Sequence, residues 1–253
     1  MPRVDRLLLE VGIAHAVVGL VCLGLLLVDA TPILGVHPAL KPLKFAMSIA
    51  VFLATMALLL PTLSVGEGTR RILAGALSIT MVVEMAIIGS QALRGRRSHF
   101  NLETPLDRVL TTAMMIGIAV LLLVMIAVAF LATVRPLAQP AVIAMGWRAA
   151  LWIFLFAGIS GIGMGARGGH SIGGVDGGPG MPVTNWSTAH GDLRVSHFFS
   201  LHALQILPLL GLLLQSLSLR AGVQWTLLGF GVAANAVLAG WTWFQALASR
   251  PLW

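Results

Sequence analysis

The sequence predicts an all-α integral membrane protein: a bundle of about seven transmembrane helices, with a long glycine-rich loop between the fifth and the sixth. The first observation is composition, because 58% of the 253 residues are hydrophobic and only 10% are charged. A soluble domain carries about 25% charged residues, so most of this exterior must face lipid. The second observation is that mainly apolar stretches of about 20 residues, the length that crosses a bilayer, recur along the chain.

Individual segments add detail to this prediction. The first follows a basic N-terminus of signal-peptide type, but it is long, contains Glu10 and His15, and lacks a clear cleavage site. We therefore expect it to be retained as a helix. The second begins within HPALKPLKF and requires Lys44 to extend toward the headgroups. The fifth contains AGISGIGMGA, whose small residues favour close helix packing. The segments are expected near residues 7–29, 42–60, 72–92, 109–134, 148–167, 194–218 and 223–247, in a single domain over residues 1–253.

The distribution of charged residues indicates which kinds of partner the protein contacts. The formal net charge is +7, and the Lys and Arg residues lie mostly between apolar segments. This distribution suits lipid headgroups and topology control, and it forms no basic face for nucleic acid. Cys22 is the only cysteine, so an intrachain disulfide is excluded. We expect a multi-pass protein of the cell membrane, the inner membrane in bacteria, with membrane lipids around it.

Polar residues are concentrated on one of the two faces. Seven crossings place the connections alternately on two sides, and one side receives HPALKP, RGRRSHFNLETPLDR and the loop near residues 167–192. The connections on the other side are short and chemically bland. One interpretation is that this face simply has longer loops. The other is a single site, built there from three loops and the adjoining helix ends.

Glu84 is the leading ionisable residue inside the predicted bundle, where such groups are costly and are functional candidates. Thr80, Glu84 and Gln91 are spaced to share one face of a helix. Glu84 and His202 both lie roughly 12 Å inside their segments at 1.5 Å per residue. We therefore predict that they form a pair or share a ligand; the alternative is a polar pair that only ties two helices together.

The histidines raise the question of a metal or haem. Asp192, His197 and His202 are of ligand type, but an ideal helix separates the two histidines by roughly 140° and 7.5 Å. They would need further ligands to hold one ion, and no standard zinc motif is present. Haem needs one axial histidine from each of two helices, for which His15 with His197 or His202 would serve. The alternative is that these histidines are packed, hydrogen-bonded residues.

The segment RGRRSHFN provides a cationic patch of Arg94, Arg96 and Arg97 beside His99. It is suited to an anionic small molecule or to lipid headgroups, and the lysines near the start of the second segment lie on the same side. The alternative is a patch that only sets topology.

Residues 169–173 read GHSIG, which matches the nucleophile elbow of hydrolases. That elbow requires a strand before the serine and a helix after it, whereas here an apolar helix precedes Ser171 and GGPG follows. Ser171 is therefore a minor candidate. Glycine-rich backbone instead favours amides that converge on an anion, with His170 and Asp176 beside them and the loop acting as a lid.

The motifs HPALKPLKF, RGRRSHFN and GDLRVSHFFSLHALQILPL together resemble a group of bacterial multi-pass membrane proteins that has no assigned activity. The resemblance spans most of the chain. It implies a compact single-domain membrane bundle and supplies no catalytic residues.

We therefore predict a polar site that opens to one membrane face. Redox or metal-assisted chemistry with haem or a transition metal is the first hypothesis. A transporter or sensor with an intramembrane Glu/His proton site is the second, and a structural or assembly subunit is the third. The predicted catalytic residues are Glu84, His197 and His202; the metal ligands are Glu84, Asp192, His197 and His202; the ligand-binding residues are Lys41, Lys44, Gln91, Arg94, Arg97, His99, His170, Asp176, Arg194 and Gln205.

Overall fold

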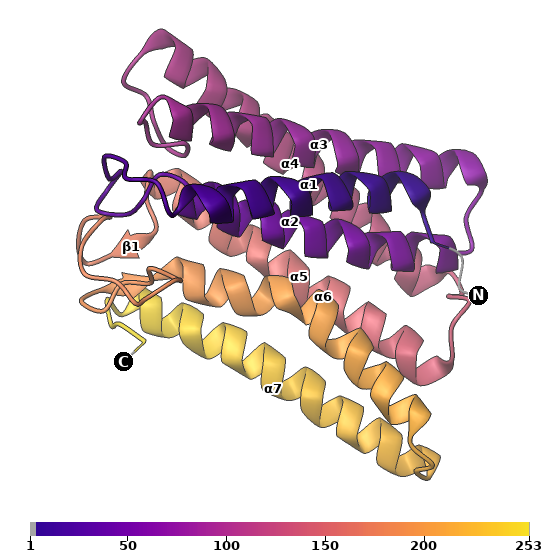
Figure 1. Ribbon diagram of the computed structural model, residues 1–253. Helices are drawn as coiled ribbons and strands as arrows, with labels where there is room; N and C mark the ends of the chain where they lie inside the picture. The colour runs from indigo at the N-terminus through magenta and orange to yellow at the C-terminus, as the bar shows by residue number, and fades with distance from the viewer. Residues whose placement is uncertain (1–3, 253) are drawn as a thin grey trace. The chain divides into compact units, whose positions relative to one another are not determined.

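The computed structural model describes residues 4–252, and in that part seven helices are long and apolar enough to cross a membrane. The prediction of an all-α membrane protein with about seven spanning helices is confirmed (Figure 1). The described strands are β1 (Ser171–Ile172) and β2 (Gly191–Asp192). The helices are α1 (Arg6–Leu25), α2 (Leu40–Leu59), which a 3₁₀ turn (Leu60–Thr62) extends, α3 (Glu67–Leu93), α4 (Pro105–Val134), α5 (Ala141–Arg167), α6 (Leu193–Ser216) and α7 (Ala221–Leu247).

Several helices begin earlier than the apolar segments indicate. The starts of α3 and α4 precede the predicted ones by several residues, because a helix continues through polar turns that hydropathy does not count. Helix α5 also begins earlier, at Ala141, through the apolar residues AVIAMGW. In α3, for example, Glu67 in the first turn forms ion pairs with Arg70 and Arg71, at 2.5 and 3.1 Å. A carboxylate in the first turn also complements the helix dipole.

The chain divides into two compact units, residues 1–127 and 128–253. Helix α4 begins in the first unit and ends in the second. The single domain expected over the whole chain stays a prediction.

In the first unit, α1, α2 and α3 pack against one another. Helix α1 approaches α2 closely at two glycines: a Cβ added to Gly12 would lie 3.3 Å from the Ala50 carbonyl oxygen, and one added to Gly19 would lie 2.8 Å from Met47 Sδ. His15, on the same face of α1, is buried. Its Nδ1 lies 2.7 Å from the Val11 carbonyl and its Nε2 lies 3.3 Å from the Met81 carbonyl of α3. Because both ring nitrogens face backbone oxygens, this haem-ligand candidate serves here as a tie between α1 and α3.

In the second unit, α6 packs against both α5 and α7. A Cβ added to Gly146 of α5 would lie 2.7 Å from the Leu207 carbonyl oxygen, and one added to Gly211 of α6 would lie 3.0 Å from Ile143 Cα. Within the small-residue run that we expected to pack closely, Gly161 and Gly163 have only ordinary contacts, at 3.7 and 3.5 Å. The glycines at which α5 and α6 approach most closely, Gly146 and Gly211, therefore lie outside that run.

The long loop after α5 is folded. Strands β1 and β2 pair antiparallel, with Ser171 opposite Asp192, and a further bridge joins Gly180 to Ser187. This hairpin, residues 168–192, covers the end of the second unit where α5 ends, α6 begins and α7 ends (Figure 1). Ile172, Leu193 and Ala246 form a small apolar core beneath it. The hairpin was not apparent from the sequence because its strands are two residues long.

Candidate functional site

In the first unit, His99 lies between a cation and a carboxylate. Its Nδ1 is 3.2 Å from Lys41 Nζ and its Nε2 is 3.4 Å from Glu84 Oε1. These three side chains, which we call the Lys41–His99–Glu84 triad, come from α2, from the loop after α3 and from α3 itself. A lysine ammonium has only donors, so it donates to Nδ1, and the ring proton of neutral His99 is then on Nε2, facing Glu84.

The loop between α3 and α4 is built to hold His99 in this position. Asn101 is fully buried, where its Nδ2 donates to the Arg97 carbonyl and its Oδ1 accepts from the Glu103 amide. The Asn101 carbonyl in turn accepts from Thr111 Oγ1 of α4, at 2.7 Å. Phe100 adopts φ of +57°, which is strained for a bulky residue. The fixed turn directs the preceding imidazole back toward the helices.

Glu84 gives the triad its depth. It lies nine residues before Leu93, the last residue of α3, which is about 14 Å of helix rise. Only 4% of Glu84 is exposed. A carboxylate inside a membrane-spanning helix is costly without a polar partner, and Nε2 of His99 faces it at 3.4 Å.

The electrostatics favour a neutral His99. Burial lowers the pKa of His99, the Lys41 charge lowers it further, and the hydrogen bond and charge of Glu84 act in the opposite direction. The net effect on this pKa is downward. A neutral imidazole has one donor and one acceptor nitrogen, which is the form that passes a proton from one side of the ring to the other.

Gln91 and Arg94, two predicted ligand-binding residues, are bound to Asp107 instead. Gln91 Nε2 donates to Asp107 Oδ1 at 2.9 Å, and Arg94 donates to the same oxygen at 2.8 Å. Asp107 also accepts from Thr104 Oγ1 at 2.7 Å, while its amide donates back to that hydroxyl. This network joins the end of α3 to the start of α4. The sequence signal that could have revealed it is Thr104-Pro-Leu-Asp107, a variant of the capping box.

The remaining cationic candidates of the first unit lie near this end. Arg97 donates to the Phe100 carbonyl at 3.3 Å and is half-buried. Lys44 is also half-buried, one turn after Lys41 on α2. Arg96 forms an ion pair with Glu103 in the exposed part of the loop.

In the second unit, Asp192 is the centre of the polar contacts at the hairpin. It caps α6 by accepting from the Arg194 amide at 3.0 Å, and it accepts from Arg194 NH2 at 2.6 Å and from the Ser187 amide at 2.9 Å. Burial raises the pKa of Asp192, but the hydrogen bonds and charge of Arg194, with smaller effects of His170 and Ser187, lower it more. The Asp192 carboxylate is therefore held ionised. Both of its oxygens, which a metal ion would need, accept hydrogen bonds from Arg194.

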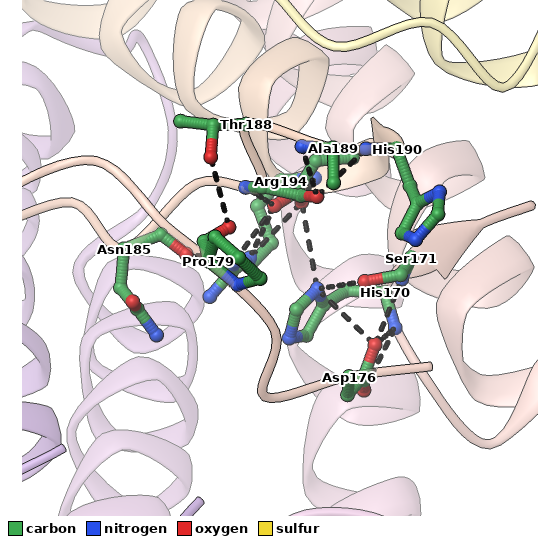
Figure 2. A network of polar contacts seen from close by, with 11 residues as sticks. His170, Ser171, Asp176, Pro179, Asn185, Thr188, Ala189, His190 and Arg194 are labelled. Carbon is green, nitrogen blue, oxygen red and sulfur yellow. Dashed lines mark hydrogen bonds and ion pairs between the residues drawn. The ribbon is translucent and has the colours of Figure 1, made fainter. Parts of the chain in front are cut away.

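The amides expected to cradle an anion already have an acceptor. The amides of His170 and Ser171 both donate to the Asp176 carboxylate, at 3.2 and 2.9 Å (Figure 2). The glycine-rich turn thus closes on a carboxylate of its own chain. Arg194, the predicted cation of this site, is paired with Asp192 and also donates to the Asn185 carbonyl.

The geometry also decides the role of Ser171. A Ser-His-Asp triad needs the hydroxyl and the carboxylate at opposite ring nitrogens of the histidine. Here the Ser171 hydroxyl, Asp176 and Asp192 all face Nδ1 of His170, at 3.3, 3.4 and 3.6 Å. In addition, helix α5 precedes the serine, where the hydrolase elbow requires a strand.

His197 and His202 are held separately on α6. His197 Nδ1 lies 2.9 Å from the Ala157 carbonyl and 2.9 Å from Ser160 Oγ, both on α5. His202 Nδ1 lies 3.1 Å from Gln205 Oε1, and its ring centroid lies 4.2 Å from that of Phe198, with the two rings tilted by 60°. Among residues 4–252, no group of three His, Cys, Asp or Glu side chains is arranged to hold a metal ion. The predicted pairing of Glu84 with His202 concerns both units and stays a prediction.

Comparisons with known protein families, with curated proteins and with solved structures find no match. The geometry of the two polar clusters is therefore what supports a function for this multi-pass membrane protein.

Proposed function

We propose that this chain is a proton-coupled membrane transporter in which a proton passes through His99 to Glu84. The observation that carries the proposal is the Lys41–His99–Glu84 triad, with contacts of 3.2 and 3.4 Å on the two sides of one imidazole. Chains of carboxylates and histidines inside membrane segments are typical of proton relays. Of the three hypotheses from the sequence, this geometry supports proton binding best.

The proposed transfer conserves protons and charge at each step. With Lys41 donating to Nδ1, neutral His99 presents its Nε2 proton to the ionised Glu84. When Lys41 withdraws, a proton from the loop end binds Nδ1, and the imidazolium gives its Nε2 proton to Glu84. Glu84 becomes a neutral carboxylic acid, and His99 is left neutral with its proton on Nδ1. Rotation of the ring, or the reverse transfer, restores the starting tautomer.

Lys41 has two roles in this scheme. Its charge opposes protonation of His99, so a second proton does not stay on the ring, and its ammonium selects the tautomer that faces Glu84. Lys44 and Arg97 lie near the same end of the first unit. We propose that they contact an anionic solute or lipid headgroups there.

Proton flux into liposomes tests the proposal. Purified protein is reconstituted with a pH-sensitive dye inside, the membrane potential is clamped, and a pH gradient is imposed. We expect wild-type flux, with a loss of tenfold or more in Glu84→Gln and His99→Gln. Glu103→Gln is the matched control, because this carboxylate is in the same loop as His99 but is exposed and paired with Arg96. Wild-type vesicles without flux, or Glu84→Gln vesicles with full flux, would overturn the proposal.

The α6 histidines favour a second candidate, haem or transition-metal binding. His197 and His202 each direct Nδ1 at a protein oxygen, so a ring proton on Nδ1 leaves the lone pair on Nε2. Metal-ligating histidines are commonly held in this way. An absorption spectrum and metal analysis of detergent-purified protein test it: a haem band or stoichiometric metal that is lost in His197→Ala or His202→Ala supports binding. A colourless, metal-free protein rules it out.

A further inference from the structure

The hairpin of the second unit holds a histidine between two carboxylates. His170 Nδ1 lies 3.4 Å from Asp176 Oδ1 and 3.6 Å from Asp192 Oδ1 (Figure 2). Arg194 joins the cluster through Asp192, at 2.6 Å between NH2 and Oδ2. Asp176 closes the turn that follows β1, and Asp192 lies on β2, so the imidazole connects the two arms of the hairpin.

The charges of this cluster do not balance while His170 is neutral. Asp176 and Asp192 contribute two negative charges and Arg194 one positive charge, which leaves a net charge of −1. The side chains of His170 and Asp176 are 20% and 17% exposed, and that of Asp192 is 2% exposed. Opposite charges attract more strongly at such partly buried positions than in bulk water. One proton on His170 brings the net charge to zero.

The elements that pack against the hairpin bring both uncharged and charged residues to it. The end of α7 meets Gly191 and Gly173 with the uncharged residues Ala246 and Ser249. Arg167 at the end of α5 and Arg250 after α7 take part in no ion pair within residues 4–252. The ring of His190 packs on Gly174 and takes part in no ion pair in the part of the chain that the structure describes.

The cluster is better suited to a proton than to a larger ligand. The turn amides are bound to Asp176, and Arg194 is bound to Asp192. The adjoining polar pocket, lined in part by His170, Ser171 and Arg194, has room for about one water molecule.

We propose that His170 is a proton-binding site that latches the hairpin. In the protonated state Nδ1–H donates to the facing carboxylates and holds the two arms of residues 168–192 together. Loss of the proton leaves the two carboxylates with a single arginine, and the arms separate more readily. The latch uses residues of the second unit, whereas the proposed proton transfer to Glu84 uses residues of the first.

Hydrogen exchange of the intact protein in nanodiscs tests the latch. After correction for the intrinsic pH dependence of exchange, amides of residues 170–176 and 187–192 should be about tenfold more protected at pH ~5.5 than at pH ~7.5. These values lie on either side of the ordinary pKa of histidine, about 6.5, and a change of one pH unit alters the ratio of protonated to neutral histidine about tenfold. His170→Gln should remove this difference.

Two further variants keep the test decisive. His190→Gln changes a histidine of the same hairpin whose ring contacts neither carboxylate, so it should retain the wild-type response. Asp176→Asn keeps an oxygen for the turn amides but removes one charge, so it should reduce the response while the hairpin stays folded. Protection that is independent of pH in the wild type, or a full response in His170→Gln, would overturn the proposal.

Discussion

Nε2 of His99 lies 3.4 Å from Oε1 of Glu84, so a residue of the loop after α3 reaches a carboxylate about 14 Å inside that helix. The contact exists because the loop folds back, held by buried Asn101 and by the hydroxyl of Thr111. It connects a buried acid with the end of the first unit through one ring. The proposed proton path depends on this relationship.

Lys41→Met should make His99 easier to protonate. Burial is the largest cause that lowers the pKa of His99 and the Lys41 charge is the second, so removal of Lys41 raises that pKa. The measurement is the pH midpoint of proton flux, or an NMR titration of His99, compared with Arg96→Gln as the control. Arg96 is paired with Glu103 in the exposed part of the loop. An unchanged midpoint in Lys41→Met would show that Lys41 does not act on the ring.

The order of the loop after α3 should decrease in acid. The pKa of His99 is lower in the folded protein than its ordinary value, so the unfolded loop binds a proton more readily. The contribution of His99 to the stability of the folded loop is therefore complete above about pH 6.5. It is lost as the pH falls through the pKa that His99 has in the folded protein. Hydrogen exchange of residues 95–104 measures this, and His99→Gln should flatten the response. Greater protection at low pH would contradict a lowered pKa for His99. The hairpin latch predicts the opposite sign, so the two loops can be compared in one experiment.

Asp107→Ala should destabilise the first unit by about 1–3 kcal/mol, the cost of leaving a buried donor such as Gln91 without its acceptor. The side chain of Asp107 is fully buried and binds Gln91, Arg94 and Thr104. Unfolding in mixed detergent micelles provides the free energy. Glu103→Ala, which removes an exposed ion pair with Arg96, should cost less than about 1 kcal/mol. Equal effects of the two variants would mean that the Asp107 network contributes little.

Gly146→Ala should separate α5 from α6. The added Cβ would lie 2.7 Å from the Leu207 carbonyl oxygen, a backbone atom that cannot move aside without shifting the helix. We expect a loss of about 1–3 kcal/mol, as for other overpacked positions. Gly229→Ala on α7 is the control, since no atom lies within 4 Å of its Cβ position. It should be neutral or stabilising by up to about 1 kcal/mol. A neutral Gly146→Ala would show that the interface relaxes without cost.

The helices follow from composition, whereas the contacts between polar residues do not. Apolar length predicts each spanning helix, because lipid leaves the backbone few alternatives. The triad was not predicted as such: the sequence placed Lys41 and His99 on one membrane face and Glu84 deeper in its helix, and it assigned Glu84 to His202. That assignment used helix depth alone, and it could not show that the loop folds back and brings His99 to Glu84. Likewise, the glycine-rich sequence of this loop predicts backbone amides that converge on an anion. It does not show that Asp176 of the same loop is that anion.

Infrared difference spectroscopy detects the protonation of Glu84 itself. Wild-type protein in lipid is titrated, and the carbonyl stretch of a protonated carboxylic acid is followed as the pH changes. The account predicts a band that is missing in Glu84→Gln, present in Glu103→Gln, and shifted in its pH midpoint by Lys41→Met. A titrating band that persists unchanged in Glu84→Gln would show that Glu84 is not the proton-binding residue.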